Sequence, residues 1–423
     1  MSFFQIPTIP WRSDIHKTIT VSCKKMHNAG PEGDTGPGDT GPGDTGPGDT
    51  GPGDTGDTVI NKTLMLYLTR IKTEIDNRQS EWDKFKKYTN PYEYIHTTIP
   101  NTSSSISKLK PLSRSYYKML EMYHMFNLGG GLPSECRTFH IAEGPGGFIE
   151  AMCELRGVPT DTYVGITLID DKNYSIPGWK KSRQFLDKHP NVEIESGKTG
   201  TGDIMCASNL KYCYEKYGGQ IDLVTADGGF DFSVDFNHQE AASAKLIFCQ
   251  IAFAVAVQKS GGNFLIKFFD TFTQVSLDML FLLSLIYNDV YFVKPNTSRY
   301  ANSEKYVVCK NFRLNAAERA SLVDCFLKEY ESFDGDRPIT SILNVKVPYM
   351  YSCKVQEYNA IFGQQQIETI STTLNLIDTS KHDRLENMKK SNLQKCVLWC
   401  QKHGVPHNSV PVNSNVFLTK GKG

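Results

Sequence analysis

The segment His140–Met152, HIAEGPGGFIEAM, joins a short apolar run to an apolar helix-like run through a dense glycine turn. Two carboxylates frame the turn, Glu143 and Glu150. Glycine allows backbone conformations and close approaches that other residues exclude, so Gly-Pro-Gly-Gly is typical of a turn that packs against another segment or a ligand. We interpret the segment as strand, turn and helix with a small-molecule site at the turn. The alternative is an ordinary tight βα turn.

Three kinds of nucleotide loop can be compared with this turn. A dinucleotide fingerprint needs G-x-G-x-x-G, but Ile149 stands where the third glycine should be. A phosphate-binding loop needs GxxxxGK[ST], and Val192 replaces the first glycine before Gly197-Lys198-Thr199. S-adenosylmethionine instead carries a sulfonium cation and an α-amino group, which need close backbone and a nearby carboxylate. The turn with Glu143 fits this third kind, a methyl-donor loop.

Strand-like and helix-like runs alternate from about residue 113 to 314. The strand-like runs are short, apolar and mostly bounded by turn residues: 137–144, 161–168, 220–229, 263–269 and 304–312. Helix-like runs cover 148–157 and 240–262, the second stopped by Gly261 and Gly262. This order predicts an α/β fold, a Rossmann-like, mostly parallel, doubly wound sheet, with helical N- and C-terminal additions.

The remaining chain divides by composition. A period-five GDTGP repeat cannot form collagen, which needs glycine at every third position, and its glycine and proline content predicts a flexible spacer. The segment before it is expected to be a docking peptide or a tail. The predicted parts are an N-terminal arm (1–32), the spacer (33–58), a helical region (59–110), the α/β domain (111–330) and a partly helical C-terminal extension (331–423).

Charge and cysteine content restrict the class of protein. The chain of 423 residues has 46 basic and 46 acidic side chains, which argues against a globally basic nucleic-acid binder, so any such binding must use a local patch. Eleven scattered cysteines without a CxxC pair, and an N-terminus without a signal-peptide pattern, predict free thiols in a reducing compartment such as the cytoplasm. The longest apolar stretch, 246–257, is too short to span a bilayer, so no membrane partner is expected.

Four ionisable residues stand out near predicted strand ends and turns. Lys267 lies between Ile266 and Phe268 in an apolar run, where a lysine is costly unless it is paired or functional. Asp227 ends a strand, at the edge where open α/β sheets bind ligands. Lys118 and Glu304, taken alone, are typical of surface charges. Methylation of a ribose 2′-hydroxyl, a poor nucleophile near neutral pH, would need such cations and carboxylates held around one oxygen.

Several motifs together resemble a known family. SRSYYKMLEM, AEGPGGF, GITL, TGDI, LVTADGGFD, FLIKFFD and SEKYVV occur in the order found in the FtsJ-like (RrmJ-like) ribose 2′-O-methyltransferases, with the loop form of the Adrift-type, cap-methylating branch. The resemblance covers about Leu112 to Phe312. It implies S-adenosyl-L-methionine as cofactor, RNA as substrate with the capped 5′ end as the expected target, and a catalytic Lys118–Asp227–Lys267–Glu304 tetrad.

Within this resemblance, Lys267 is expected to contact the 2′-hydroxyl and to steer or deprotonate it. The neighbouring charge of Lys118 is expected to make a neutral amine more accessible, while Asp227 and Glu304 orient the two amines. Which amine is neutral at which step stays open. The expected cofactor-binding residues are Glu143, Gly144, Pro145, Gly146, Gly147, Phe148, Thr167, Leu168, Asp203, Ile204 and Asp227.

Two basic patches flank the expected site, and each is either a solvated loop face or part of a single-stranded RNA path. Their residues are Lys108, Lys110, Arg114 and Tyr117 in the first patch and Lys180, Lys181 and Arg183 in the second. A metal site near the C-terminus is not expected. Cys396, Cys400 and His403 share one helical face, but Cys400 and His403 are too close for a zinc finger, and a buried thiol stripe is the preferred interpretation.

Three hypotheses follow for the whole chain. The first is an S-adenosylmethionine-dependent RNA 2′-O-methyltransferase. The second is a non-catalytic RNA-binding or scaffold protein that retains the fold, and the third is methylation of another acceptor. Protein partners could bind the N-terminal arm or the C-terminal extension, and the oligomeric state is left open.

Overall fold

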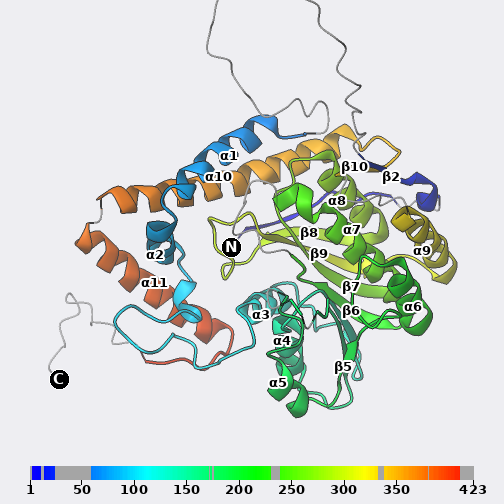
Figure 1. The fold of residues 1–423 in the computed structure, drawn as a ribbon, viewed down its shortest axis with the longest axis horizontal. Helices are drawn as coiled ribbons and strands as arrows, with labels where there is room; N and C mark the ends of the chain where they lie inside the picture. Colours follow the sequence, from blue (N-terminus) through cyan, green and yellow to red (C-terminus); the bar gives the residue numbers. More distant parts are fainter. Residues whose placement is uncertain are drawn as a thin grey trace, which may run out of the picture.

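The computed structural model describes residues 2–10, 14–23, 59–170, 172–173, 176–229, 239–331, 338–379 and 381–409. The GDTGP repeat lies outside the described residues, so its assignment as a spacer stays a prediction. The described part is an eight-stranded sheet with helices against both faces and a layer of long helices along one side (Figure 1).

The sheet has the strand order β1-β8-β9-β7-β6-β3-β4-β5, and a separate two-stranded sheet pairs β10 with β2. The strands are β1 (Ser2–Gln5), β2 (Ile19–Cys23), β3 (Arg137–Ile141), β4 (Thr162–Ile166), β5 (Val192–Glu195), β6 (Ile221–Ala226), β7 (Gln258–Phe268), β8 (Tyr287–Lys294), β9 (Lys305–Phe312) and β10 (Ile339–Leu343).

Five neighbouring strands, β5-β4-β3-β6-β7, run parallel, whereas β9 is antiparallel to both β7 and β8. The chain winds outward from β3 in both directions, which confirms the predicted doubly wound α/β fold. In such a sheet the loops after the two central strands diverge and leave a crevice for ligands. The carboxyl ends of β3 and β6 mark that crevice here.

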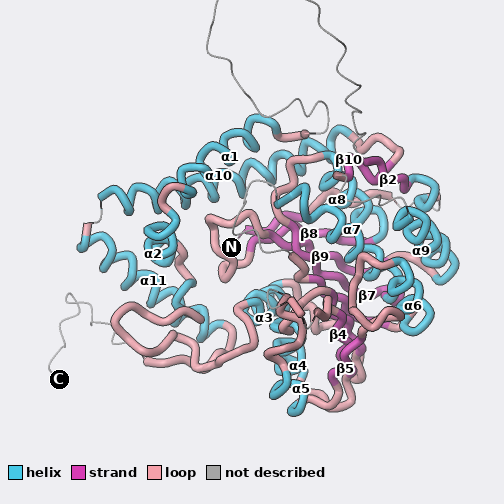
Figure 2. Tube along the Cα trace, viewed as in Figure 1, coloured by secondary structure: helices cyan, strands magenta, loops and turns pink. Residues whose placement is uncertain are grey.

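Helices cover the sheet and extend beyond it (Figures 1 and 2). They are α1 (Lys62–Asp76), α2 (Gln79–Thr89), α3 (Ser115–Met125), α4 (Gly147–Arg156), α5 (Arg183–Lys188), α6 (Ala207–Tyr217), α7 (Gln239–Val257), α8 (Gln274–Ile286), α9 (Ala316–Glu331), α10 (Tyr349–Thr379) and α11 (His382–Lys402), with short 3-10 turns η1 (Ile15–Thr18) and η2 (Glu93–Ile95).

Alternating residues of the strands pack into two hydrophobic cores, one on each face of the sheet. Val224 and Ala226 of β6 pack in one core with α6 to α9, whereas Leu223 packs in the other with α3, α4 and α11. Helix α7 is the one described helix long and apolar enough to cross a membrane by composition, but 78% of its apolar window is buried inside the protein. It is therefore a central core helix. It ends at Val257, before the glycine pair expected to stop it, because that pair belongs to the irregular start of β7.

The N-terminal segment differs from the expected arm. Ser2–Gln5 forms the outer strand β1, antiparallel to β8, and β2 pairs with β10 of the C-terminal extension. Phe4 stacks on Tyr358 of α10 with ring centroids 4.7 Å apart. A four-residue strand at a sheet edge carries too little periodicity to be recognised in the sequence. The described parts of residues 1–32 therefore belong to the packed structure.

The helical additions confirm the expected helices before and after the α/β domain. Helix α10 packs along α1 and α2, and α11 packs on α2 and η2 (Figure 1). Cys396 and Cys400 of α11 are fully buried in the second core, as the thiol-stripe interpretation predicts. Among the described residues, no group of three or more His, Cys, Asp or Glu side chains is arranged to hold a metal ion.

Candidate active site

The four residues expected to form a tetrad lie together at the carboxyl edge of the sheet. Lys118 Nζ on α3 is 2.6 Å from Glu304 Oε1, just before β9. Lys267 Nζ near the end of β7 is 3.3 Å from Asp227 Oδ1, just after β6, and donates to the Asp227 carbonyl at 2.7 Å. Residues separated by up to 186 positions thus lie together, because the ends of β6 and β7, the start of β9 and helix α3 all lie at this edge of the sheet.

Tyr306 of β9 joins the two ion pairs. Its hydroxyl donates to Asp227 Oδ1 at 2.7 Å and accepts from Lys118 Nζ at 3.2 Å. The side chains therefore form one continuous chain of polar contacts, from Lys267 through Asp227, Tyr306 and Lys118 to Glu304. This chain holds both amines in fixed positions, as a reaction at a single substrate oxygen requires.

Burial and mutual charge shift the titration of this group. Burial lowers the pKa of Lys118, and the charges of Arg114 and Lys267 lower it further, against the opposing carboxylates Glu304 and Asp227. Burial alone would raise the pKa of Glu304, but the cations Lys118, Lys267 and Arg114 hold it well below its usual range. Glu304 is therefore a carboxylate, and Lys118 gives up its proton more readily than an exposed lysine.

The loop between β8 and β9 fixes Glu304 relative to α3. Glu121, one helical turn beyond Lys118, accepts hydrogen bonds from the Asn296 and Thr297 amides at 3.0 and 3.1 Å. In the same loop Ser298 Oγ donates to Glu304 Oε1 at 2.8 Å. One loop thus forms hydrogen bonds both to α3, which carries Lys118, and to Glu304. These bonds fix the position of α3 relative to the start of β9.

The glycine turn follows β3 and leads into α4, as the sequence predicts. Gly146 has φ +105°, a backbone conformation that residues with a side chain rarely adopt. A Cβ on Gly144 would lie 2.6 Å from the Gly178 carbonyl, so the turn packs directly against the loop before α5. The glycines are therefore needed for the turn itself and for close backbone approach.

Glu143 is buried beneath this turn with one oxygen satisfied. Thr225 Oγ1 donates to Glu143 Oε1 and accepts in turn from His140 Nδ1 at 2.7 Å, which fixes the histidine tautomer. Glu143 Oε2 is buried and accepts no hydrogen bond from any described residue, although His140 Nδ1 lies 3.3 Å away. A buried acceptor without a donor is costly, so this oxygen is suited to a ligand that brings one.

The other expected cofactor residues lie at neighbouring strand ends. Thr167 and Leu168 directly follow β4, and Asp203 and Ile204 lie in the loop after β5. The two loops touch, because a Cβ on Gly202 would lie 2.0 Å from the Thr167 carbonyl. The ends of β3, β4, β5 and β6 thus supply one continuous line of loops, from the predicted adenine side to Asp227.

The sequence profile of the FtsJ-like methyltransferase family matches residues 111–312, the part of the chain that carries this line of loops and the tetrad. Residues 111–312 form an FtsJ-like methyltransferase domain. The match begins four residues before α3 and ends with β9, so Lys118 and Glu304 both fall inside it.

Curated relatives of the FtsJ-like domain include two cap-specific methyltransferases and one protein that is named as inactive. The chain is 33% identical over 193 residues to cap-specific mRNA (nucleoside-2′-O-)-methyltransferase 1A of Caenorhabditis briggsae, covering 44% of this chain and 21% of that protein. It is 30% identical to the type 2 enzyme of Mus musculus, covering 75% of this chain and 42% of that protein. The inactive type 1B protein of Caenorhabditis briggsae is 29% identical, covering 53% of this chain and 28% of that protein. The chain thus spans less than half the length of these relatives.

The residues predicted to bind RNA differ in how far the structure exposes their side chains. Lys108, Lys110, Lys181 and Arg183 are exposed. Tyr117 was predicted wrongly: it is 1% exposed and packs in the second core, with its hydroxyl bonded to Ser107, so its ring cannot stack on a base. The error arises because the side chain lies on the inner face of α3, one position before Lys118.

Lys180 is held by its own loop, whereas Arg114 lies beside the tetrad. Lys180 Nζ donates to the carbonyls of Asp170, Asn173 and Ile176, so its ammonium holds its own loop together. Arg114 is half-buried at the start of α3, where burial and Arg299 lower its pKa and the nearby Glu304 raises it. Arg114 therefore lies beside the tetrad, while Lys180 is a poorer candidate for phosphate contact than Lys181.

Sequence reasoning missed three residues of the site: Tyr306, Ser298 and Arg299. Arg299 makes a bidentate ion pair with Glu93 of η2, with distances of 2.9 and 2.5 Å. This charge pair holds the pKa of Glu93 at about 2 against the effect of burial. Tyr306 could have been predicted from the sequence, because a residue two positions after Glu304 points to the same side of an extended chain.

Replacing Tyr306 by phenylalanine should lower the kcat of methyl transfer about 10-fold, in line with the loss of one hydrogen-bonded link, and leave KM nearly unchanged. The ring stays in place, so the fold should persist. Lys118 loses a hydrogen-bond acceptor that favours its charged form, so its pKa should fall. The rise of kcat with pH, which depends on a neutral amine, should therefore occur at lower pH. Tyr358→Phe, which loses a bond to the Gln5 carbonyl far from the site, should change neither kcat nor its pH profile. An unchanged profile in Tyr306→Phe would contradict the linking role.

Proposed function

We propose that the protein transfers a methyl group from S-adenosyl-L-methionine to a ribose 2′-hydroxyl of RNA at the capped 5′ end of mRNA. The observation that carries this proposal is the continuous contact chain that brings Lys118, Asp227, Lys267 and Glu304 together at the carboxyl edge of the sheet. The names of the relatives, which are cap-specific mRNA 2′-O-methyltransferases, support the acceptor and the cap.

The glycine turn and its carboxylate fit this methyl donor. The unpaired Glu143 Oε2 offers a buried acceptor for the donor's α-amino group. The neighbouring loops after β4 and β5 offer Thr167 and Leu168 to the ribose and Asp203 and Ile204 to the adenine. Burial raises the pKa of Glu143, and a bound cationic ligand would favour its charged form.

The tetrad supplies what the acceptor needs. Bound S-adenosyl-L-methionine provides a methyl group on a positively charged sulfur. The acceptor 2′-hydroxyl would lie beside Lys267 Nζ, which Asp227 holds in place, and a neutral amine would take the hydroxyl proton as the oxygen accepts the methyl group. Lys118, buried and paired with Glu304, places a second amine near the oxygen.

The exposed lysines around the FtsJ-like domain supply the first contacts for RNA. Lys108 and Lys110 precede α3, and Lys181 and Arg183 lie at the start of α5. Arg114, between Lys110 and Lys118, places a cation next to the tetrad. Cations for phosphates on both sides of the site suit a single strand that crosses it.

The second candidate is a non-catalytic RNA-binding protein with the same fold. One specific observation favours it, since a relative of similar identity is named as inactive. The intact contact chain of the tetrad favours catalysis, because it holds two amines at the sheet edge where open α/β sheets bind ligands. The experiment that tests the function must therefore separate donor binding from transfer.

The purified protein should bind S-adenosyl-L-methionine in calorimetry and transfer its methyl group to a 2′-hydroxyl of capped RNA. Glu143→Gln should weaken donor binding about 10- to 100-fold, because the charged acceptor for the donor's α-amino group is lost. Glu154→Gln, on the outer part of α4, is the matched control and should bind the donor like the wild type.

The outcomes distinguish the candidates. RNA binding without donor binding, or donor binding without transfer to any capped RNA, would support the non-catalytic protein. Transfer to capped RNA that persists when the terminal 2′-hydroxyls are replaced by hydrogen would move the acceptor to another atom. Equal donor affinity in wild type and Glu143→Gln would remove this carboxylate from the donor site.

A further inference from the structure

Helix α11 carries a one-sided row of basic side chains. Arg384, Lys395 and Lys402 are spaced by eleven and seven positions, which places all three on one edge of an α-helix. All three are exposed, and none forms an ion pair with another described residue. We name these residues, together with Lys381 at the start of the helix, the α11 basic row.

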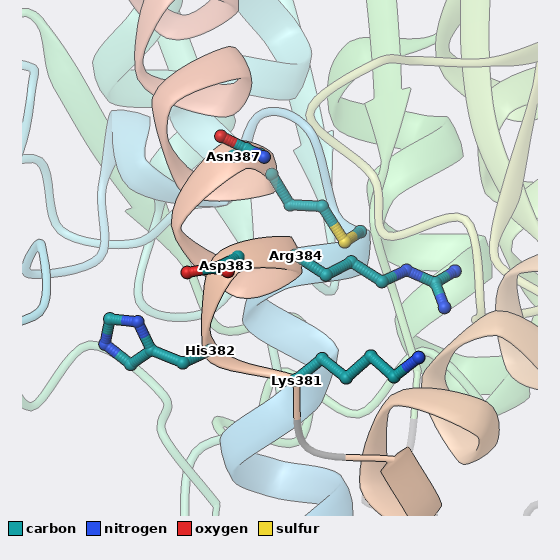
Figure 3. A pocket seen from close by; sticks show the side chains of 6 residues that line it. Lys381, His382, Asp383, Arg384 and Asn387 are labelled. Carbon is teal, nitrogen blue, oxygen red and sulfur yellow. The ribbon is translucent and has the colours of Figure 1, made fainter.

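The start of this row borders an open cavity of about 600 Å³. In Figure 3, Lys381 and Arg384 extend side by side, away from His382 and Asp383. The cations of this end are thus separated from the carboxylate of Asp383. Asp383 also lines this cavity, but a ligand on the basic side would meet the two charged donors of Lys381 and Arg384.

The charge at this end of the chain is unlike that of the whole protein. From Asn387 to Gly423 the sequence has no acidic residue but contains lysines at 389, 390, 395, 402, 420 and 422, although the complete chain is neutral. A protein without net charge that binds a polyanion needs such a local excess of positive charge. Lys389 is paired with Glu386 and Lys390 lies on another side of α11, so neither extends the row.

The row leads toward the tetrad. After α11 the chain runs beside the segment that precedes α3, where the Lys108 amide donates to the Pro406 carbonyl and the Asn408 amide to the Ile106 carbonyl, both at 2.8 Å. His403 stacks on His124 of α3 with ring centroids 5.3 Å apart. The C-terminal end of α11 is therefore fixed beside the segment that carries Lys108 and Lys110 and precedes α3.

We propose that the α11 basic row binds the phosphate backbone of single-stranded RNA downstream of the nucleotide held at the tetrad. This inference rests on the proposed function. The 21 residues of α11 span about 30 Å at 1.5 Å per residue, so the row serves RNA well beyond the first few nucleotides. Helical spacing places these cations on one edge of α11 and Asp383 and Glu386 on other sides. A row of cations along one edge matches the charges of a phosphate backbone.

The test compares two triple variants of the full chain. Arg384→Glu/Lys395→Glu/Lys402→Glu reverses the row. Lys211→Glu/Lys328→Glu/Lys390→Glu makes the same change in net charge at exposed positions on α6, α9 and another side of α11. Fluorescence anisotropy measures the Kd of each for capped RNA of about 20 and about 5 nucleotides over a range of salt concentrations.

The row variant should bind the longer RNA at least 10-fold more weakly, with its salt slope reduced by about 2, since each lost phosphate contact contributes about 0.7 for a single strand. Binding of the short RNA should stay within about 2-fold of wild type, and the control triple should match wild type on both. A glutamine triple at the row positions, which adds no new repulsion, should show a smaller loss in the same direction and guards against misfolding.

Equal weakening by the row and control triples would show a general charge effect and overturn the proposal. Equal weakening on short and long RNA would also overturn it, because the row would then act through the active site. Unchanged binding of long RNA would leave an acidic protein as the partner of the row. Methyl transfer to the short RNA is measured separately, so loss of the proposed function would show as absent transfer by the wild type whatever the row does to binding.

Discussion

Lys267→Ala should abolish methyl transfer while leaving donor affinity unchanged. The amine is the only polar part of this side chain, and it lies 3.3 Å from Asp227 Oδ1 at the end of β7, on the tetrad side of the crevice. The glycine turn and Glu143, which are expected to hold the donor, follow a different strand, β3. A positioned acid or base contributes about 10² to 10⁴-fold to a rate, so we expect a fall in kcat of about 10³-fold.

Calorimetry with S-adenosyl-L-methionine and a single-turnover transfer assay on capped RNA measure the two effects in the same preparation. Lys211→Ala, at an exposed position on α6, is the matched control and should transfer at the wild-type rate. Transfer by Lys267→Ala at a comparable rate would remove this amine from the reaction. A parallel loss of donor binding would instead indicate that the side chain supports the donor loop.

Sequence reasoning recovers the fold, and the position of Lys267, because their signals are local. The Gly-Pro-Gly-Gly turn after an apolar run predicts a strand–turn–helix unit, and the order of strands and helices predicts the doubly wound sheet. Lys267 is conspicuous since a lysine between Ile266 and Phe268 is costly in a buried strand. The family resemblance adds Lys118 and Glu304, which alone would be taken for surface charges.

The features that were missed depend on packing between distant segments. Strand β1 is defined by its partner β8, almost 300 positions away, and its four residues carry no periodicity of their own. Tyr117 lies between Arg114, three positions before it, and Lys118, directly after it, yet the turn of α3 places its ring in the core. The rotation of the helix decides whether a tyrosine ring points toward a substrate base or into the core. Successive residues point in different directions, so the side chain of Tyr117 does not follow that of Lys118.

A second buried ion cluster also escapes the sequence, because its members come from three segments. Asp270, three positions after Lys267, binds Lys72 of α1 at 3.0 Å and Lys305, next to Glu304, at 3.4 Å. All three side chains are buried. The cluster therefore attaches the N-terminal helical addition directly behind the two strand ends that carry tetrad residues.

Asp270→Asn should destabilise the protein by about 3 to 5 kcal/mol, because it leaves two buried lysines without a carboxylate. Burial already lowers the pKa of Lys305, so without Asp270 this amine either stays charged at a high desolvation cost or loses its proton. Asp378→Asn, in the exposed pair with Arg78, should change stability by no more than about 1 kcal/mol. Denaturant unfolding monitored by circular dichroism measures both, and similar values for the two variants would contradict the role of the cluster.

The same cluster predicts how stability depends on acid. Burial alone would raise the pKa of Asp270, but Lys72 and Lys305 hold it below its usual value. A carboxyl group with a lowered pKa in the folded state contributes stability above its unfolded pKa of about 4, and this contribution is lost as the pH falls through the folded value. Wild type should therefore lose more stability than Asp270→Asn as the pH falls below about 4. Parallel acid profiles would show that Asp270 titrates alike in the folded and unfolded states, and the helical addition would then be held by packing alone.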